Sequence, residues 1–127
     1  MNNRQISVWC RVALLMLSGS SLPVLTQAHH SFAMFDKTRT VTLKGTVSKV
    51  EWSNPHVFLF VAVPDGEAHK VYAVECGSIN MLSHGGWKMN TVKPGDKVTV
   101  VIYPLRDGRP GGLIDSVTTP AGAVVKG

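Results

Sequence analysis

The sequence predicts an all-β fold with one short helix, a five-stranded OB-like β-barrel, preceded by a signal peptide. Three observations support this prediction. Segments of apolar and polar alternation are separated by turns rich in Gly, Pro and Asn. The first segment is long and shifts phase midway, as a strand bending around a small barrel does. One short helical pattern stands between the third and fourth strands, which completes the element order of an OB barrel.

The N-terminal segment, residues 1–28, has the three parts of a signal peptide. Arg4 and Arg11 supply a basic start, a short apolar run follows, and Ala28 closes a small-residue cleavage site. The unbroken apolar run is far shorter than the roughly 20 residues that span a bilayer, so no transmembrane anchor is expected after cleavage. We therefore expect a periplasmic protein whose mature barrel domain comprises residues 29–127.

The charge of the mature domain argues against a nucleic-acid partner. Of the 13 Lys and Arg residues, Arg4 and Arg11 precede the cleavage site, so 11 remain against 8 Asp and Glu, a net charge of +3. These cations are spread singly, whereas phosphate binding needs several clustered ones. One cysteine, Cys76, remains in the mature domain, so its core rather than an internal disulfide must stabilise the fold.

The first three strands follow from apolar periodicity. Residues 40–52 alternate at period two and then resume one position out of phase at Val50 and Trp52, which is typical of a β-bulge. Residues 57–63 are apolar at every position, which predicts a strand covered on both faces, or shielded by the N-terminal segment. A hairpin turn with an Asp-Gly pair precedes the third strand, residues 70–75.

The second half of the domain contains the helix and the last two strands. Ser78 is the expected N-cap of a short helix that stops at Gly85. The fourth and fifth strands are predicted over residues 97–103 and 113–118, and the tail, residues 120–127, is expected to fray. A plain antiparallel sandwich or half-barrel is the alternative architecture.

In an OB barrel, ligands usually meet the loops after the first and fourth strands. In this sequence these loops are the Asn-Pro-His turn at residues 54–56 and a cationic, glycine-rich loop at residues 106–112. We therefore expect the binding residues to lie in these two loops and in the chain that leads into the barrel.

Several motifs link the mature sequence to a known family. They are His-His-Ser-Phe-Ala-Met-Phe-Asp from His29, Lys-Gly-Thr-Val from Lys44, Glu-Trp-Ser-Asn-Pro-His-Val from Glu51, Gly-Trp from Gly86 and Lys-Pro-Gly-Asp-Lys-Val-Thr-Val from Lys93. Over essentially the whole mature chain, the sequence resembles a family of small exported bacterial proteins of unknown function. The resemblance implies a periplasmic location and a small β-domain. The chain departs from the family's pattern at Cys76, Ile79 and His84.

The predicted mature N-terminus is a candidate metal ligand. If cleavage follows Ala28, the α-amine and imidazole Nδ1 of His29 chelate a metal, and one more imidazole completes a three-nitrogen copper site. His56 is the preferred additional ligand, and His30 is a weaker one because side chains alternate along an extended segment. If cleavage falls one residue earlier, His30 becomes the third residue, which binds Cu(II) or Ni(II) together with the backbone. The alternative is a mobile terminus that binds metal only opportunistically.

For the other candidate residues, a purely structural role is the alternative to a binding role. Arg106 and Arg109 can clamp an anionic ligand, or they belong to an ordinary solvated loop. Trp52 can serve as an aromatic ligand platform, although tryptophans in a small domain more often fill the core. His56 has an alternative as a turn histidine bonded to backbone, and Cys76 is predicted to be a buried small apolar residue.

The three methionines of the mature domain are predicted to fill the core, although their sulfur atoms also suit Cu(I). They are Met34, Met81 and Met89.

No catalytic motif is present: the sequence has no nucleophile elbow, Walker loop, HExxH or paired CxxC, so enzymatic activity is not predicted. The sequence predicts a small periplasmic binding protein that takes copper or another divalent metal as its cofactor. The alternative is a periplasmic interaction or structural domain that binds a protein or a small anionic ligand at the barrel loops.

Overall fold

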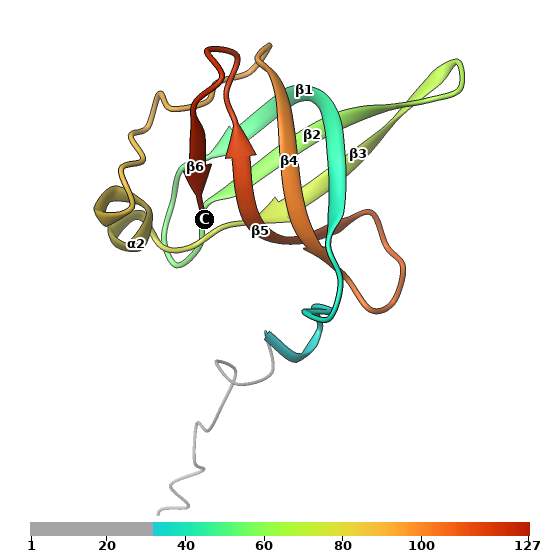
Figure 1. Ribbon diagram of the computed structural model, residues 1–127, viewed down its shortest axis with the longest axis horizontal. Helices are drawn as coiled ribbons and strands as arrows, with labels where there is room; N and C mark the ends of the chain where they lie inside the picture. Colours follow the sequence, from blue (N-terminus) through green and yellow to red (C-terminus); the bar gives the residue numbers. More distant parts are fainter. Residues whose placement is uncertain (1–31) are drawn as a thin grey trace, which may run out of the picture.

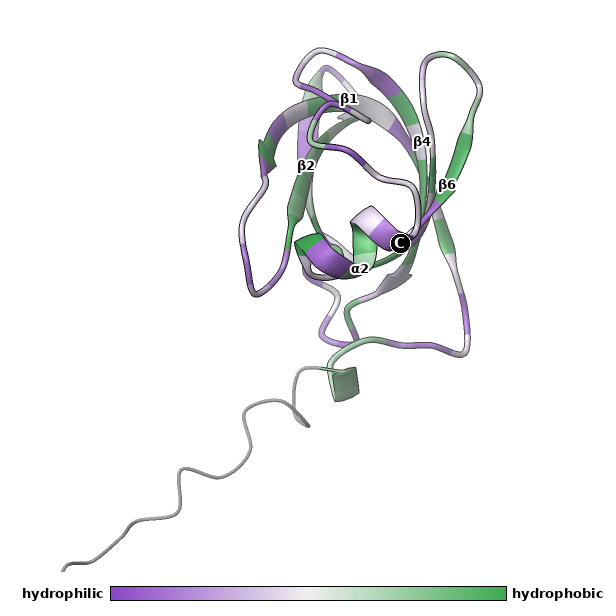
Figure 2. Ribbon diagram, turned by 90° about the vertical axis from the view of Figure 1, so that its left-hand side faces the viewer, coloured by the Kyte–Doolittle hydropathy of each residue, from purple (hydrophilic) through white to green (hydrophobic). Residues whose placement is uncertain are grey.

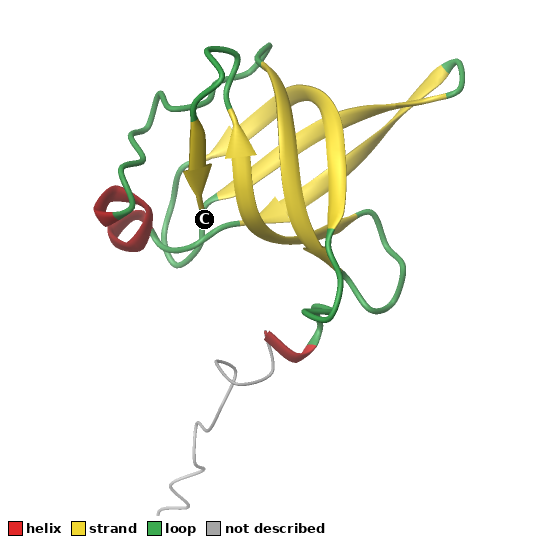
Figure 3. Cartoon of the chain, in the orientation of Figure 1, coloured by secondary structure: helices red, strands yellow, loops and turns green. Residues whose placement is uncertain are grey.

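The computed structural model describes residues 32–127, so the predicted signal peptide and the two N-terminal histidines, His29 and His30, lie outside the described residues. The described chain forms a six-stranded sheet that closes into a barrel, with one short helix beside it (Figures 1 and 3). Its elements are β1 (Val41–Glu51), β2 (Phe58–Asp65), β3 (Ala68–Glu75), α2 (Ile79–His84), β4 (Lys97–Pro104), β5 (Gly111–Thr118) and β6 (Val124–Lys126).

The strand pairing confirms the predicted OB-like topology. The first half of β1 pairs with β4 and its second half with β2, so one strand serves both halves of the sheet. Parallel pairing of β3 with β5 closes the barrel. The register shifts between Val47 and Lys49, where the sequence predicts a bulge. A side chain at Gly45 would overlap the carbonyl oxygen of Ala62, so the bend of β1 requires a glycine there.

The core fills the inside of the barrel with branched apolar side chains, and α2 lies at one end of it (Figure 2). Leu82 is the buried residue of α2, and Trp87 packs with it in the same cluster. Ser78 caps the helix by accepting a hydrogen bond from the Met81 amide, and Gly85 is its C-cap. The helix is therefore capped at both ends and attached to the core by Leu82.

The expectation that β2 is covered on both faces is wrong. Leu59 and Val61 are fully buried, whereas the alternating residues Phe58 and Phe60 are only half-buried on the outer face. Their rings pack against each other with centroids 6.4 Å apart. The run is apolar throughout because its inward residues fill the core and its outward residues, Phe58 and Phe60, pack against each other.

The C-terminal tail is not frayed, contrary to the sequence prediction. β6 pairs with β5, and the carbonyl oxygen of Lys126 accepts a hydrogen bond of 2.6 Å from the indole nitrogen of Trp87. The Lys126 ammonium lies 2.9 Å from the Asp115 carboxylate. A buried tryptophan needs an acceptor for its indole N–H, and the tail supplies it.

The methionines are not core residues, which is a third correction. Met81 and Met89 are 68% and 70% exposed, and Met34 is 39% exposed. The barrel interior is filled by Val, Leu and Ile, and these methionines lie on loops or on the outer side of the short helix. Within residues 32–127, no helix has both the length and the apolar character needed to cross a bilayer.

Candidate functional site

A pocket of about 180 Å³ lies where the loop after β1, the end of β3, α2 and β5 meet. Its walls are mostly apolar, with Leu113 and Ile114 on β5 and Met81 on α2. Its polar side chains include His56 and Glu75. The pocket thus combines an imidazole, a carboxylate and a thioether in an apolar setting.

His56 and Glu75 form the polar centre of this pocket. The Nδ1 atom of His56 lies 3.2 Å from Oε1 of Glu75, and their side chains are 37% and 16% exposed. A neutral imidazole that donates its Nδ1–H to a carboxylate keeps an unshared electron pair on Nε2. In a pair of this kind Nε2 is the ring nitrogen that stays available to a ligand.

The backbone explains why His56 meets Glu75. The Val57 amide donates to the Gly77 carbonyl at 3.1 Å, and the Cys76 amide donates to the Val57 carbonyl at 2.8 Å, so the β2–β3 ladder continues past β2. Phe58 is the direct partner of Glu75, which places His56 diagonally across from it on the same face.

The turn that carries His56 is attached to the helix. The Oδ1 atom of Asn54 accepts a hydrogen bond of 3.2 Å from the amide of Ile79, the first residue of α2. The Asn54–Pro55 peptide bond is cis. The turn is therefore connected to α2 as well as to the two strands, and it holds the imidazole at the pocket.

Cys76 lines the pocket but is not an activated thiol. The residue is 1% exposed, in agreement with its predicted role as a small buried residue. Burial raises the pKa of the Cys76 thiol to about 12, and the neighbouring Glu75 carboxylate adds to the rise. The thiol is therefore protonated at neutral pH and is a weak nucleophile.

The chain leading into β1 is bound along the loop after β4. Phe35 is 3% exposed and forms an antiparallel bridge with Leu105. The Asp36 amide donates to the Pro104 carbonyl at 2.8 Å, and the Arg106 amide donates to the Met34 carbonyl at 2.9 Å. These bonds hold residues 34–36 against the barrel, so the first described residues have a defined position.

Phe32 belongs to the same pocket as His56. Its ring is 53% exposed, and the Lys37 ammonium lies 4.9 Å from the ring centroid. Phe35 is thus the buried phenylalanine of this segment, while Phe32 lies at the pocket. The first described residue and the Asn-Pro-His turn therefore line one pocket.

The candidate anion clamp does not converge in the structure. The guanidinium of Arg106 donates to the Ala33 carbonyl at 3.1 Å, whereas that of Arg109 pairs with the Asp107 carboxylate at 2.8 Å. Trp52 is half-buried and packs against the core cluster. Arg106 therefore contributes to positioning the N-terminal segment, and His56 is the one candidate nitrogen ligand among the described residues that lines this pocket.

Sequence reasoning missed Glu75 and Met81 as neighbours of His56. The signal for Glu75 was its place on a strand, since strand-borne acids are few in this chain. Its contact with His56 depends on the β2–β3 register, which periodicity alone does not give. Residues 32–127 contain no cluster of three or more His, Cys, Asp or Glu side chains placed to hold a metal.

The fold and the pocket define a class of protein: a single OB-type barrel that carries an orienting carboxylate–histidine pair at the end closed by its helix. Within this class, the chain belongs to a family of unknown function, DUF6152, whose model matches residues 17–115. Neither the curated proteins nor the solved structures provide a significant match to it.

Proposed function

We propose that the protein is exported to the periplasm and that its mature form binds copper, or a similar divalent metal, through the N-terminal residue His29 together with His56. The observation that carries the proposal is the position of Phe32, which lines the same pocket as His56. His29 is three residues upstream of Phe32, and three residues span at most roughly 10 Å of extended chain. The covalent chain therefore keeps the proposed amino terminus within reach of the pocket.

The attachment of the chain after Phe32 strengthens this proposal. Residues 34–36 are bound to the β4–β5 loop by two backbone hydrogen bonds and the buried ring of Phe35. A terminus fixed so close to its end loses less conformational entropy when a metal orders the last residues. This argues against purely opportunistic binding by a long free tail.

The contact between His56 and Glu75 supports a ligand role for His56. Metal-bound histidines usually donate their second ring N–H to a carboxylate or carbonyl, which fixes the tautomer and makes the bound nitrogen more basic. The 3.2 Å contact at Nδ1 provides this partner and leaves Nε2 for the metal. The α-amine and Nδ1 of His29 with Nε2 of His56 give three nitrogen ligands, a set that suits Cu(II).

The composition of the pocket also favours copper over other metals. The thioether of Met81 lines the pocket and is a soft donor that suits Cu(I). The apolar walls from β5 lower the local polarity around the site. The alternative function, anion or protein binding by the β4–β5 loop, is less favoured because Arg106 already bonds the N-terminal segment.

The proposal is tested by Cu(II) titration of the mature protein after mass spectrometry has defined its first residue. We expect His56→Ala to weaken Cu(II) binding by more than tenfold. His69→Ala is the matched control, because His69 is exposed on β3 and does not line this pocket. Equal affinities in the two variants would overturn the proposal. That result would favour a site made by the terminus alone, as expected if cleavage leaves His30 in third position.

A further inference from the structure

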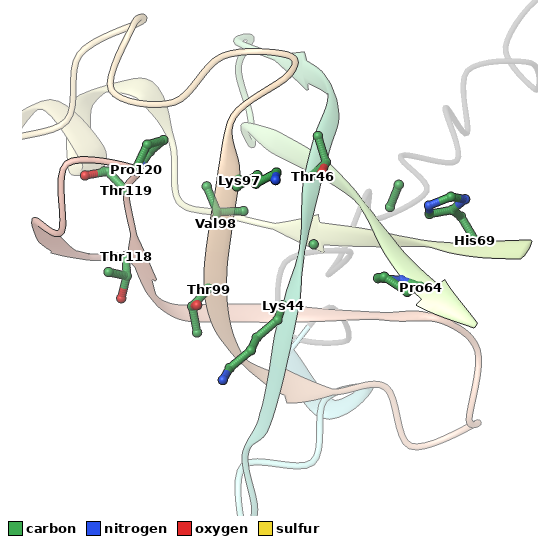
Figure 4. A pocket seen from close by; sticks show the side chains of 12 residues that line it. Lys44, Thr46, Pro64, His69, Lys97, Val98, Thr99, Thr118, Thr119 and Pro120 are labelled. Atoms are coloured by element: carbon green, nitrogen blue, oxygen red, sulfur yellow. The ribbon is translucent and has the colours of Figure 1, made fainter. Parts of the chain in front are cut away.

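A second hollow, a groove of about 630 Å³, lies over the outer faces of β1 and β4 and extends to β5 and the β2–β3 hairpin (Figure 4). Its lining shares no residue with the pocket of His56. The volume falls within the roughly 300–1,000 Å³ typical of small-molecule sites.

The register of the strands arranges polar side chains across the groove in two rows. Lys44 on β1 is paired with Thr99 on β4, and Thr99 is paired with Thr118 on β5. In the next row, Thr46 is paired with Lys97. The inward neighbours Val98 and Val117 are apolar and buried, so all five side chains lie on the outer face. Figure 4 shows Lys44, Thr46, Lys97 and Thr99 along the two neighbouring strands.

The groove has positive charge and no negative charge. Lys44 and Lys97 are diagonal neighbours on paired strands, so two cations lie on the same face of the sheet. No Asp or Glu lines the groove, and neither lysine takes part in the ion pairs of residues 32–127. Residues 1–31 contain no Asp or Glu that can neutralise them. Within residues 32–127, the two lysines therefore have no carboxylate partner.

The remaining lining provides hydrogen bonds and apolar contact. The hydroxyls of Thr46, Thr99 and Thr118 can each donate to an anion oxygen. His69 adds an imidazole from the hairpin side, and Ala62 and Pro64 add an apolar wall. Ammonium groups bind phosphate as point charges, while hydroxyls orient it. This donor set fits a phosphate monoester on a small organic group.

We propose that this groove binds a small phosphate monoester through Lys44 and Lys97, with the threonine hydroxyls orienting the phosphoryl group. The source of the phosphoryl group is either a soluble metabolite or a lipid headgroup, since both present the same chemistry. The proposal uses no residue of the copper site, so the two sites can succeed or fail separately.

The test is a titration of the ¹⁵N-labelled mature protein with glycerol 3-phosphate at low salt, followed by NMR. We expect saturable shifts in the amides of the groove strands, and affinity lowered about tenfold by Lys44→Gln or Lys97→Gln, since removing one charge–phosphate contact costs roughly 1.4 kcal/mol. Lys88→Gln is the control, because Lys88 is exposed and lines neither hollow. Each variant's own NMR spectrum reports whether it is folded.

A second arm of the experiment distinguishes the two sources of phosphate. Vesicles that contain phosphatidic acid are compared with vesicles of phosphatidylcholine alone. Binding only to the acidic vesicles, lost in the Lys44→Gln/Lys97→Gln variant, supports the lipid source, and binding to soluble glycerol 3-phosphate supports the metabolite. The proposal is overturned if the protein binds neither acidic vesicles nor glycerol 3-phosphate. It is also overturned if Lys88→Gln loses as much binding as the groove variants.

Discussion

The imidazole Nδ1 of His56 and the carboxylate of Glu75 lie 3.2 Å apart, although the two residues are separated by a hairpin in sequence. The extension of the β2–β3 ladder at Val57 and Cys76 creates this contact. The β2–β3 register therefore places a carboxylate beside Nδ1 of His56. The proposed metal site uses the other ring nitrogen, Nε2, so the pair links the fold to the proposed function.

Glu75→Gln is the first test of this link. The amide can still contact the imidazole but no longer carries a charge that makes Nε2 more basic, so Cu(II) affinity is expected to fall about 10- to 100-fold. Isothermal titration measures the change. Glu67→Gln is the control, because Glu67 is an exposed residue of the β2–β3 turn. An unchanged affinity in Glu75→Gln would show that Glu75 does not act on the metal ligand.

Arg106→Ala tests whether the bound N-terminal segment matters for the metal site. The substitution removes the 3.1 Å hydrogen bond to the Ala33 carbonyl but leaves the backbone bonds, so we expect a several-fold loss of Cu(II) affinity, equivalent to about 0.5–1.5 kcal/mol. Arg109→Ala changes the same charge in the same loop without touching the segment. Equal effects of the two substitutions on affinity would contradict a positioning role for Arg106.

The ion pair between Asp115 and Lys126 makes the stability of the tail depend on pH. The hydrogen bond from Lys126 lowers the pKa of Asp115 below its usual value. The stabilisation is therefore complete above the unfolded pKa of about 3.9 and disappears as the pH falls through the lower folded value.

Asp115→Asn is expected to reduce the free energy of unfolding at neutral pH by roughly 0.2–1 kcal/mol, because the pair is partly exposed. Urea unfolding of both proteins at pH 7 and at about pH 2.5 measures the difference, which should shrink at the lower pH. Asp65→Asn, at an exposed residue near the hairpin turn, serves as the control. A difference that stays constant with pH would exclude the ionised pair as its cause.

Cys76 provides a test of burial at the pocket floor. Because its pKa is raised to about 12, the native thiol is expected to react with iodoacetamide at pH 8 roughly a thousandfold more slowly than the same thiol in denaturant. A protein that begins at His29, as proposed for the mature form, lacks Cys10 and gives a signal from Cys76 alone. Comparable rates in the two conditions would show that the pocket floor opens readily.

The barrel itself could be predicted from local signals. The phase shift within residues 40–52 indicates the bulge of β1. The glycine at position 45 is the sequence signal for the place where β1 bends close to the backbone of Ala62. Ser78 and Gly85 mark the ends of the only regular helix between the third and fourth strands. These signals depend on neighbouring residues, so a single sequence contains them.

The features that could not be predicted from the sequence depend on contacts between residues far apart in the chain. The three residues of β6 carry no periodic pattern, and their order comes from pairing with β5 and from an indole donor 39 residues away. The outward side of β2 looks like core because Phe58 and Phe60 shield each other. The contact of His56 with Glu75 likewise requires knowledge of strand register.

The central claim is that the mature amino terminus and His56 bind one copper ion. Pulsed EPR of the Cu(II)-loaded mature protein measures this most directly, because the remote nitrogen of each bound imidazole modulates the echo. The account predicts two coordinated imidazoles in the wild-type protein and one in His56→Ala. Identical spectra from the two proteins would contradict it.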